Sequence, residues 1–99
     1  MERRFDISTF VDVLTKEKAL CNLVNRYVSL RKELKITQRE LSTRSGVSYG
    51  SIRRFESTGD ISLNSLLNIA VALDCLEDFE KLFVNTPIID VEKIFYGKW

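Results

Sequence analysis

Hydrophobic side chains recur along most of this chain at spacings of three and four residues, which is the pattern of helices with one buried face. No stretch alternates convincingly between hydrophobic and polar positions, so strands are not expected. From Thr86 the helical pattern stops, and Pro87 reinforces that stop. The sequence therefore predicts an all-α domain over residues 1–85 and a short non-helical tail over residues 86–99. The hydrophobic positions that define the helices are Ile7, Phe10, Val11 and Leu14; Leu20, Leu23, Val24, Tyr27, Leu30 and Leu34; Leu66, Leu67, Ala70 and Leu73; and Leu76, Phe79, Leu82 and Phe83.

Three helix starts share one arrangement of residues. In each, a hydroxyl side chain that can cap the helix follows one hydrophobic residue and precedes another, and these two can pack together across the first turn. Glu40 completes a capping box at the first of these starts. Gly46 suits the left-handed position that would end the same helix. These features predict helix starts near residues 37, 48 and 62. The three arrangements are Ile36, Thr37 and Leu41; Val47, Ser48 and Ile52; and Ile61, Ser62 and Leu66.

The first two of these helices are short and nearly adjacent in the sequence. Two short helices joined by a three- or four-residue turn that contains glycine form a helix-turn-helix, which is here predicted over residues 37–57. Its hydrophobic side chains are spaced so that both helices and the helix after them can share one core. The expected core residues are Leu41, Ile52, Phe55, Leu66 and Leu73.

Composition limits the class of protein. A chain of 99 residues suits one domain, and its 44% hydrophobic and 29% charged content indicates a globular protein. There is no apolar run of membrane-spanning length and no evident signal peptide, so a cytoplasmic protein without membrane contact is expected. Cys21 and Cys75 are expected to be reduced thiols in the core. The chain has no histidine and no nucleophile–base or phosphate-loop pattern, so no metal site, cofactor or enzymatic activity is expected.

Positive charge is concentrated in the middle of the chain. Residues 26–55 carry eight basic and two acidic side chains, a net charge of +6. Residues 56–92 carry one basic and eight acidic side chains, a net charge of −7. A chain with a net charge of only +1 is therefore built from a basic and an acidic half. Because the basic block coincides with the predicted helix-turn-helix, we expect a surface that faces an anion.

Residues 37–73 resemble the DNA-binding domain of phage repressors and Cro, the Xre/Cro-type helix-turn-helix family, and with the preceding helix the resemblance covers roughly residues 20–83. There are two departures. Ser42 stands where the family usually has alanine, and the turn after Glu56 reads STGD rather than a shorter Asn-Gly form. The resemblance implies a compact bundle of five to six helices, in which the start and outer face of the helix beginning near Ser48 enter the major groove. The matching residues are Gln38, Leu41, Gly46, Val47, Ser48, Ile52, Phe55 and Glu56.

Helical geometry then separates the core side of that helix from its outer side. At about 100° per residue, Ile52 and Phe55 define the buried side and Gly50 points away from it. Arginine is the commonest reader of a guanine edge, and the N-terminus of a helix favours phosphate. The residues predicted to bind DNA are Thr37, Gln38, Arg39, Arg44, Ser48, Tyr49, Gly50, Ser51, Arg53, Arg54 and Ser57.

Several of these residues have a simpler alternative interpretation. Tyr49 could pack against the neighbouring helix, and Gln38 could be an ordinary exposed residue of a first turn. Arg53 and Arg54 could serve only to keep the surface soluble. Gly50 could be tolerated, at a cost of up to ~1 kcal/mol in helix stability.

The resemblance favours a sequence-specific regulator, a repressor, that binds double-stranded DNA as a homodimer. An alternative is the antitoxin of a toxin–antitoxin pair, because the chain also looks like the HipB-like regulators that accompany HipA-type kinases. In that case the acidic half and the tail would bind a toxin or kinase partner. The hydrophobic residues of the tail could also fold back on their own domain or join a dimer. They are Ile88, Ile89, Val91, Ile94, Phe95, Tyr96 and Trp99.

Overall fold

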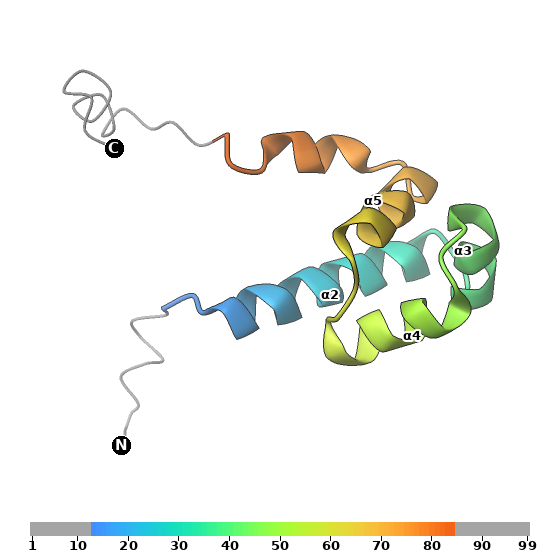
Figure 1. Cartoon of the computed structure of the whole chain (residues 1–99), viewed down its shortest axis with the longest axis horizontal. Coiled ribbons are helices and arrows are strands. Elements are labelled where there is room, and N and C mark those ends of the chain that lie inside the picture. The colour runs from blue at the N-terminus through green and yellow to red at the C-terminus, as the bar shows by residue number, and fades with distance from the viewer. Residues whose placement is uncertain (1–12, 85–99) are drawn as a thin grey trace.

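The computed structural model describes residues 13–84, which form four α-helices and a final 3₁₀ helix (Figure 1). No described residue lies in a strand, so the prediction of an all-α domain is confirmed. The tail over residues 86–99 lies outside the described residues, as does most of the helix expected over residues 7–14. The two described residues of that expected helix, Val13 and Leu14, are exposed and non-helical. The helices are α2 (Lys16–Glu33), α3 (Gln38–Ser45), α4 (Tyr49–Thr58), α5 (Leu63–Ala72) and η1 (Leu76–Lys81).

All three predicted helix starts are confirmed. The hydroxyl of Thr37 accepts a hydrogen bond from the backbone N–H of Glu40 at 3.0 Å, and the Glu40 carboxylate accepts the N–H of Thr37 at 3.4 Å, which completes the capping box. The hydroxyls of Ser48 and Ser62 cap α4 and α5 by accepting the backbone N–H of Ser51 and of Ser65, each at 3.0 Å. Thr15 caps α2, a start that the hydrophobic pattern alone did not locate.

The turn between α3 and α4 uses both a glycine and a serine. Gly46 has a φ of +78°, in the left-handed region that glycine adopts without strain, and its N–H donates to the carbonyl of Ser42. The hydroxyl of Ser42 donates to the carbonyl of Val47 at 2.6 Å. The serine that replaces the family's usual alanine therefore fits the crossing and ties α3 to the turn.

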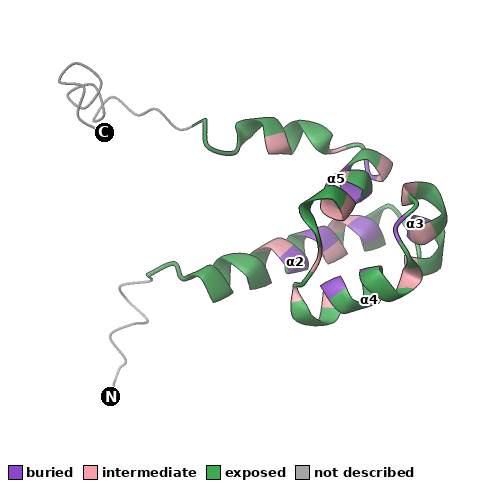
Figure 2. Ribbon diagram, in the orientation of Figure 1, coloured by how far each residue is buried: buried purple, intermediate pink, exposed green. Residues whose placement is uncertain are grey.

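The core lies where α3 packs against α4 and α5, and where α4 packs against α2 (Figure 2). Leu41, Ile52 and Phe55 are fully buried, as predicted. Leu73 is buried too, whereas Leu66 is half-buried and packs against the core. The other buried hydrophobic residues are Val24, Tyr27, Ile36, Val47, Ile69 and Ala70.

The prediction that both cysteines lie in the core is wrong for Cys21. Its side chain is exposed, and Cys75 is half-buried; both thiols are free. The physical reason is the length of α2. It has 18 residues, against 8 in α3 and 10 in each of α4 and α5, so its first turns extend past the helices that would cover them (Figure 1).

Candidate nucleic-acid interface

The inner side of α4 is held by a half-buried carboxylate as well as by hydrophobic packing. Glu56 accepts four hydrogen bonds, from the phenol of Tyr27 at 2.7 Å, from Arg31 Nε and Nη2 at 3.0 and 3.1 Å, and from the amide of Gln38 at 2.9 Å. Tyr27 and Arg31 belong to α2, and Gln38 belongs to α3. One side chain of α4 therefore fixes that helix to both of its neighbours.

Arg31 was counted in the basic block, but it does not belong to the basic surface. It is only 7% exposed, and besides its bidentate pairing with Glu56 it donates from Nη1 to the carbonyl of Ile36 at 2.9 Å. Its positive charge is thus neutralised inside the fold. Burial and the neighbouring Glu56 carboxylate raise the pKa of Tyr27 well above its ordinary value, so the phenol remains a donor.

The structure places Gln38 differently from the other residues predicted to bind DNA. Its side chain is half-buried, and its amide is hydrogen-bonded to Glu56. Only its backbone, in the first turn of α3, remains beside Thr37 and Arg39 at the surface. The side chain therefore helps to hold α3 to α4 in this structure.

The outer side of α4 has the opposite character. Five of the residues of α4 that were predicted to bind DNA are exposed: Gly50, Ser51, Arg53, Arg54 and Ser57. Figure 2 shows how much of α4 is exposed. A Cβ atom added to Gly50 would have no neighbouring atom within 4 Å. Nothing within the described residues therefore requires a glycine at this position.

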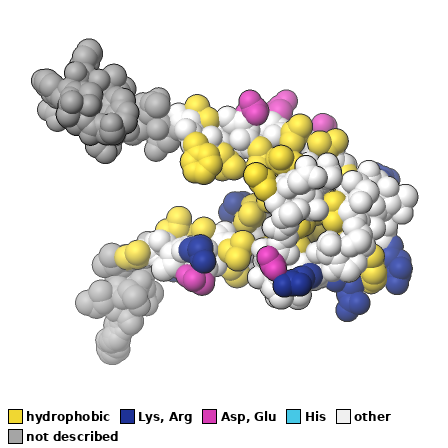
Figure 3. Space-filling model, in the orientation of Figure 1, with side chains coloured by type: hydrophobic (Ala, Val, Ile, Leu, Met, Phe, Trp, Pro, Cys, Tyr) yellow, Lys and Arg dark blue, Asp and Glu magenta, His cyan; other side chains and the backbone are white. Residues whose placement is uncertain are grey.

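Tyr49 connects two of the basic residues. The guanidinium carbon of Arg39, from α3, lies 4.0 Å from the centre of the Tyr49 ring, and that of Arg53 lies 5.6 Å from it. Both distances are within the range of cation–π attraction. The two arginines come from different helices, α3 and α4, but lie against one half-buried ring. Figure 3 shows basic side chains gathered at the end of the molecule where α3 and α4 lie.

Two further arginines have partners on the surface. Arg44 pairs with Glu40 at 3.0 Å, and Arg54 pairs with Asp60 at 2.7 Å. The side chains of Arg54 and Asp60 are 68% and 64% exposed, so water competes for this pair and it is worth at most ~1 kcal/mol. Either arginine can leave its partner for a phosphate or a base at little cost.

The hydroxyl groups are largely committed to helix ends. Ser48 accepts the N–H of Ser51 as the cap of α4 and donates to the Ser51 hydroxyl at 2.8 Å. Ser57 donates to the carbonyl of Arg54 at 3.2 Å. These serines lie on the same exposed surface as the arginines, and each side chain already has a hydrogen-bond partner within the protein.

The sequence prediction missed the polar residues that adjoin this surface. Ser62 and Ser65, at the start of α5, and Asp60, in the turn before it, line a shallow polar depression together with Ser51 and Arg54. The depression has a volume of about 410 Å³. The available signal was the cap at Ser62, because the N-terminus of a helix is a place where phosphate can bind.

The comparisons with known proteins give a family for this arrangement. A family model described as helix-turn-helix matches residues 29–79, which is more than half of the chain. Neither the comparison with curated proteins nor the comparison with solved structures gave a match. Among the described residues, no helix is both long enough and apolar enough to cross a membrane. The matched segment includes α3, α4 and the turn between them, and the chain belongs to the Xre/Cro-type helix-turn-helix family of DNA-binding regulators.

Proposed function

We propose that this protein is a sequence-specific repressor that places α4 in the major groove of its operator. The observation that carries the proposal is the division of α4 into two sides. Ile52 and Phe55 are buried, and Glu56 is hydrogen-bonded to neighbouring helices. Gly50 and Arg53, on the other side of α4, are exposed. A helix divided in this way can approach a base edge without disturbing its own core.

Arg53 and Arg54 are the proposed base readers. A guanidinium group matches the O6 and N7 acceptors of guanine with two parallel hydrogen bonds. Arg53 has no ion pair among the described residues, and the Tyr49 ring limits the directions it can take. Arg54 would exchange its exposed bridge to Asp60 for a base.

The start of α3 is the proposed phosphate contact. Thr37 and Arg39 lie at its N-terminus, where backbone N–H groups and the helix dipole favour a negative charge. Arg39 is already oriented by Tyr49. Arg44 would have to break only its exposed ion pair with Glu40 to reach the DNA backbone. Such contacts would set affinity and register without reading sequence.

We further propose that the protein acts as a homodimer, because one helix-turn-helix buries little surface and useful specificity needs two half-sites. The test is selection of bound duplexes from a random DNA pool by the full chain. We expect an enriched inverted repeat with half-site centres about 10 base pairs, or a multiple of that, apart. Enrichment of a single site without symmetry would contradict the homodimer but not the DNA-binding function. No enrichment over the starting pool would contradict the whole proposal.

A second candidate function, the antitoxin of a toxin–antitoxin pair, is favoured by the acidic surface of η1. Glu77, Asp78 and Glu80 are all exposed on this short helix, away from α3 and α4. A partner with a basic surface would be attracted to it. The test is copurification with the product of a neighbouring gene, for the wild type and for Glu77→Lys/Glu80→Lys. Copurification that the reversal abolishes, with DNA binding unchanged, would support the antitoxin function. Absence of any copurifying partner would contradict it.

A further inference from the structure

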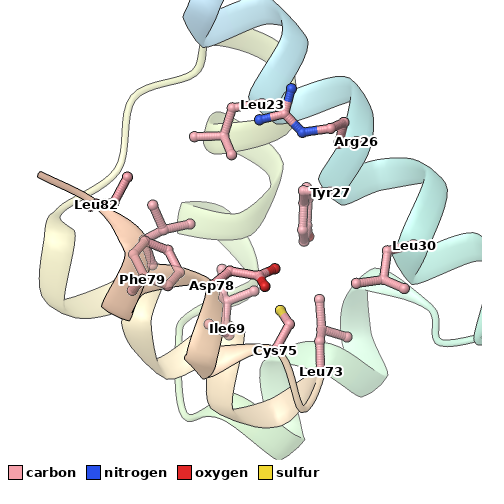
Figure 4. A pocket seen from close by; sticks show the side chains of 12 residues that line it. Leu23, Arg26, Tyr27, Leu30, Ile69, Leu73, Cys75, Asp78, Phe79 and Leu82 are labelled. Carbon is pink, nitrogen blue, oxygen red and sulfur yellow. The ribbon is translucent and has the colours of Figure 1, made fainter. Parts of the chain in front are cut away.

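An open hydrophobic groove separates α2 from η1 and α5. It has a volume of about 310 Å³. Figure 4 shows Leu23 and Leu30 of α2 on one side, and on the other Phe79 of η1 and Leu82, the residue directly after η1. The helix η1 packs against α5 but leaves a gap to α2. In Figure 3 hydrophobic side chains line both walls of this gap. None of the proposed DNA-binding residues lines it.

Apolar side chains at the groove wall and directly after it in the chain are unusually exposed. Leu82 is 54% exposed and Phe83, which follows it, is 101% exposed. Phe83 also has a φ of +62°, a left-handed conformation that costs a bulky residue energy. A contiguous exposed apolar patch of this kind usually marks a surface that is covered by something else.

We propose that the C-terminal tail of the same chain, residues 86–99, folds back into this groove. The first argument is position: Leu82 lines the groove, so the tail begins only four residues from its wall. Closing so short a loop costs little entropy, and the tail reaches the groove at a high effective concentration.

The second argument is composition. Half of the fourteen residues in the tail are large hydrophobic ones, and three of these are Phe95, Tyr96 and Trp99. Aromatic side chains bury about 150–250 Å² each, so two or three of them would cover a groove of this size. The groove spans Leu23 to Leu30 on α2, about two turns, and a tail of fourteen residues is long enough to cover it in a helical or an extended conformation.

The third argument is charge. Arg26 lies on the α2 side of the groove and Asp78 on the η1 side, so both bring charge to a largely apolar lining (Figure 4). The tail carries Asp90, Glu92 and Lys93 among its hydrophobic residues, so either of these charges can find an opposite partner.

The N-terminal residues are a less suitable occupant. They precede the start of α2 in the chain. At that end of α2, Glu17, Leu20 and Cys21 line a second depression, between α2 and the end of α4, which is separate from the hydrophobic groove. A second copy of the chain could supply its tail instead, but that tail would have to compete with one that is attached beside the groove.

The chain contains a single tryptophan, Trp99, which reports the position of the tail directly. The test is acrylamide quenching of its fluorescence in the full chain, without DNA, so that it does not depend on the proposed function. We expect Leu82→Asp to increase the quenching constant severalfold, because it places a charge on the groove wall. Val71→Asp is the matched control: Val71 is 59% exposed, close to the value for Leu82, but it lies on α5 outside the groove. Both variants are checked for the helical content and unfolding midpoint of the wild type.

A crosslinking experiment identifies which chain supplies the tail. In a Cys21→Ser background, Cys75 is the remaining native thiol, and it lies in the groove. We would place one cysteine at a time at Ile88, Val91 and Phe95, oxidise the dilute protein, and compare the products without reducing agent. A covalently closed monomer in at least one variant, together with protected Trp99, would support the proposal. Covalent dimers instead, or a Trp99 that is as quenchable in the folded wild type as in urea, would overturn it.

Discussion

The two sides of α4 differ in how far their charged side chains are committed to the fold. On the inner side, Glu56 accepts four hydrogen bonds, and its side chain and that of Arg31 are only 12% and 9% exposed. On the outer side, less than two turns earlier, a Cβ atom at Gly50 would meet no atom within 4 Å. Arg53 there lies 5.6 Å from the centre of the Tyr49 ring and has no ion pair among the described residues. The comparison teaches that charge alone does not mark a functional residue. Both sides are charged, but the charges of the inner side are paired inside the fold, whereas those of the outer side are exposed to a ligand.

The largest expected effect is on the inner side. Glu56→Ala would leave the buried Arg31 guanidinium unpaired, and we expect it to lower the free energy of unfolding by about 3–5 kcal/mol. Asp60→Ala is the control, because it removes the exposed partner of Arg54 and should cost at most ~1 kcal/mol. Urea unfolding of both variants measures the difference. Equal losses in the two variants would show that the inner network has no special role.

On the outer side, the largest effect is expected on base readout. Replacing whichever of Arg53 and Arg54 contacts a guanine by alanine should cost about 1–3 kcal/mol in operator affinity and relax preference at one base pair per half-site. Lys81→Ala, on exposed η1, removes the same charge away from α4 and should change neither property. Affinity measurements with operator variants provide the test. Both single arginine variants would have to keep wild-type affinity and wild-type base preference to contradict the prediction.

Arg39→Ala should act on affinity rather than on specificity. Because we place Arg39 at a phosphate, its loss should weaken binding similarly on all sequences and reduce the slope of log affinity against log salt by about one. Titrations at several salt concentrations, on the operator and on unrelated DNA, measure this. A loss confined to the operator, with the slope unchanged, would argue against a phosphate contact.

Tyr49 should contribute through the two arginines that it orients. Tyr49→Phe keeps the ring and should bind DNA almost as the wild type does, whereas Tyr49→Ala removes a contact with each of Arg39 and Arg53. At an exposed site each contact is worth about 0.5–1 kcal/mol. Equal loss in both variants would indicate that the hydroxyl group, and not the ring, makes the important contact.

Gly50→Ala gives the smallest effect but separates the two interpretations of this glycine. Alanine favours helix, and the site has room for its methyl group, so the free protein should gain about 0.5–1 kcal/mol in stability. If DNA approaches Gly50 closely, operator affinity should fall at the same time. A variant that is more stable and binds as tightly as the wild type would show that the glycine is merely tolerated.

The parts of the fold that sequence predicted well are those set by local rules. The caps at Thr37, Ser48 and Ser62 and the left-handed Gly46 depend on residues a few positions apart, so one chain segment contains the whole signal. The exposed side of α4 likewise follows from the position of Ile52 and Phe55 in a regular helix.

The parts that sequence did not predict are pairings across the fold. Glu56 meets Arg31 across 25 positions and Gln38 across 18, and hydrophobic periodicity does not indicate which polar residues will meet. Arg31 therefore looked like one more surface charge, and the hydrogen bond of Gln38 to Glu56 was not expected. The meeting of Arg39 with Tyr49 was missed for the same reason, since it joins two helices.

The central claim is that the outer side of α4, with the start of α3, lies against DNA while the rest of the domain does not. At 11.5 kDa the full chain suits nuclear magnetic resonance, and titration of the ¹⁵N-labelled protein with its selected operator tests the claim most directly. The account predicts the largest amide shifts at residues 37–39 and 49–57, with little change along η1. Largest shifts along η1 and α5, with α4 unchanged, would contradict it.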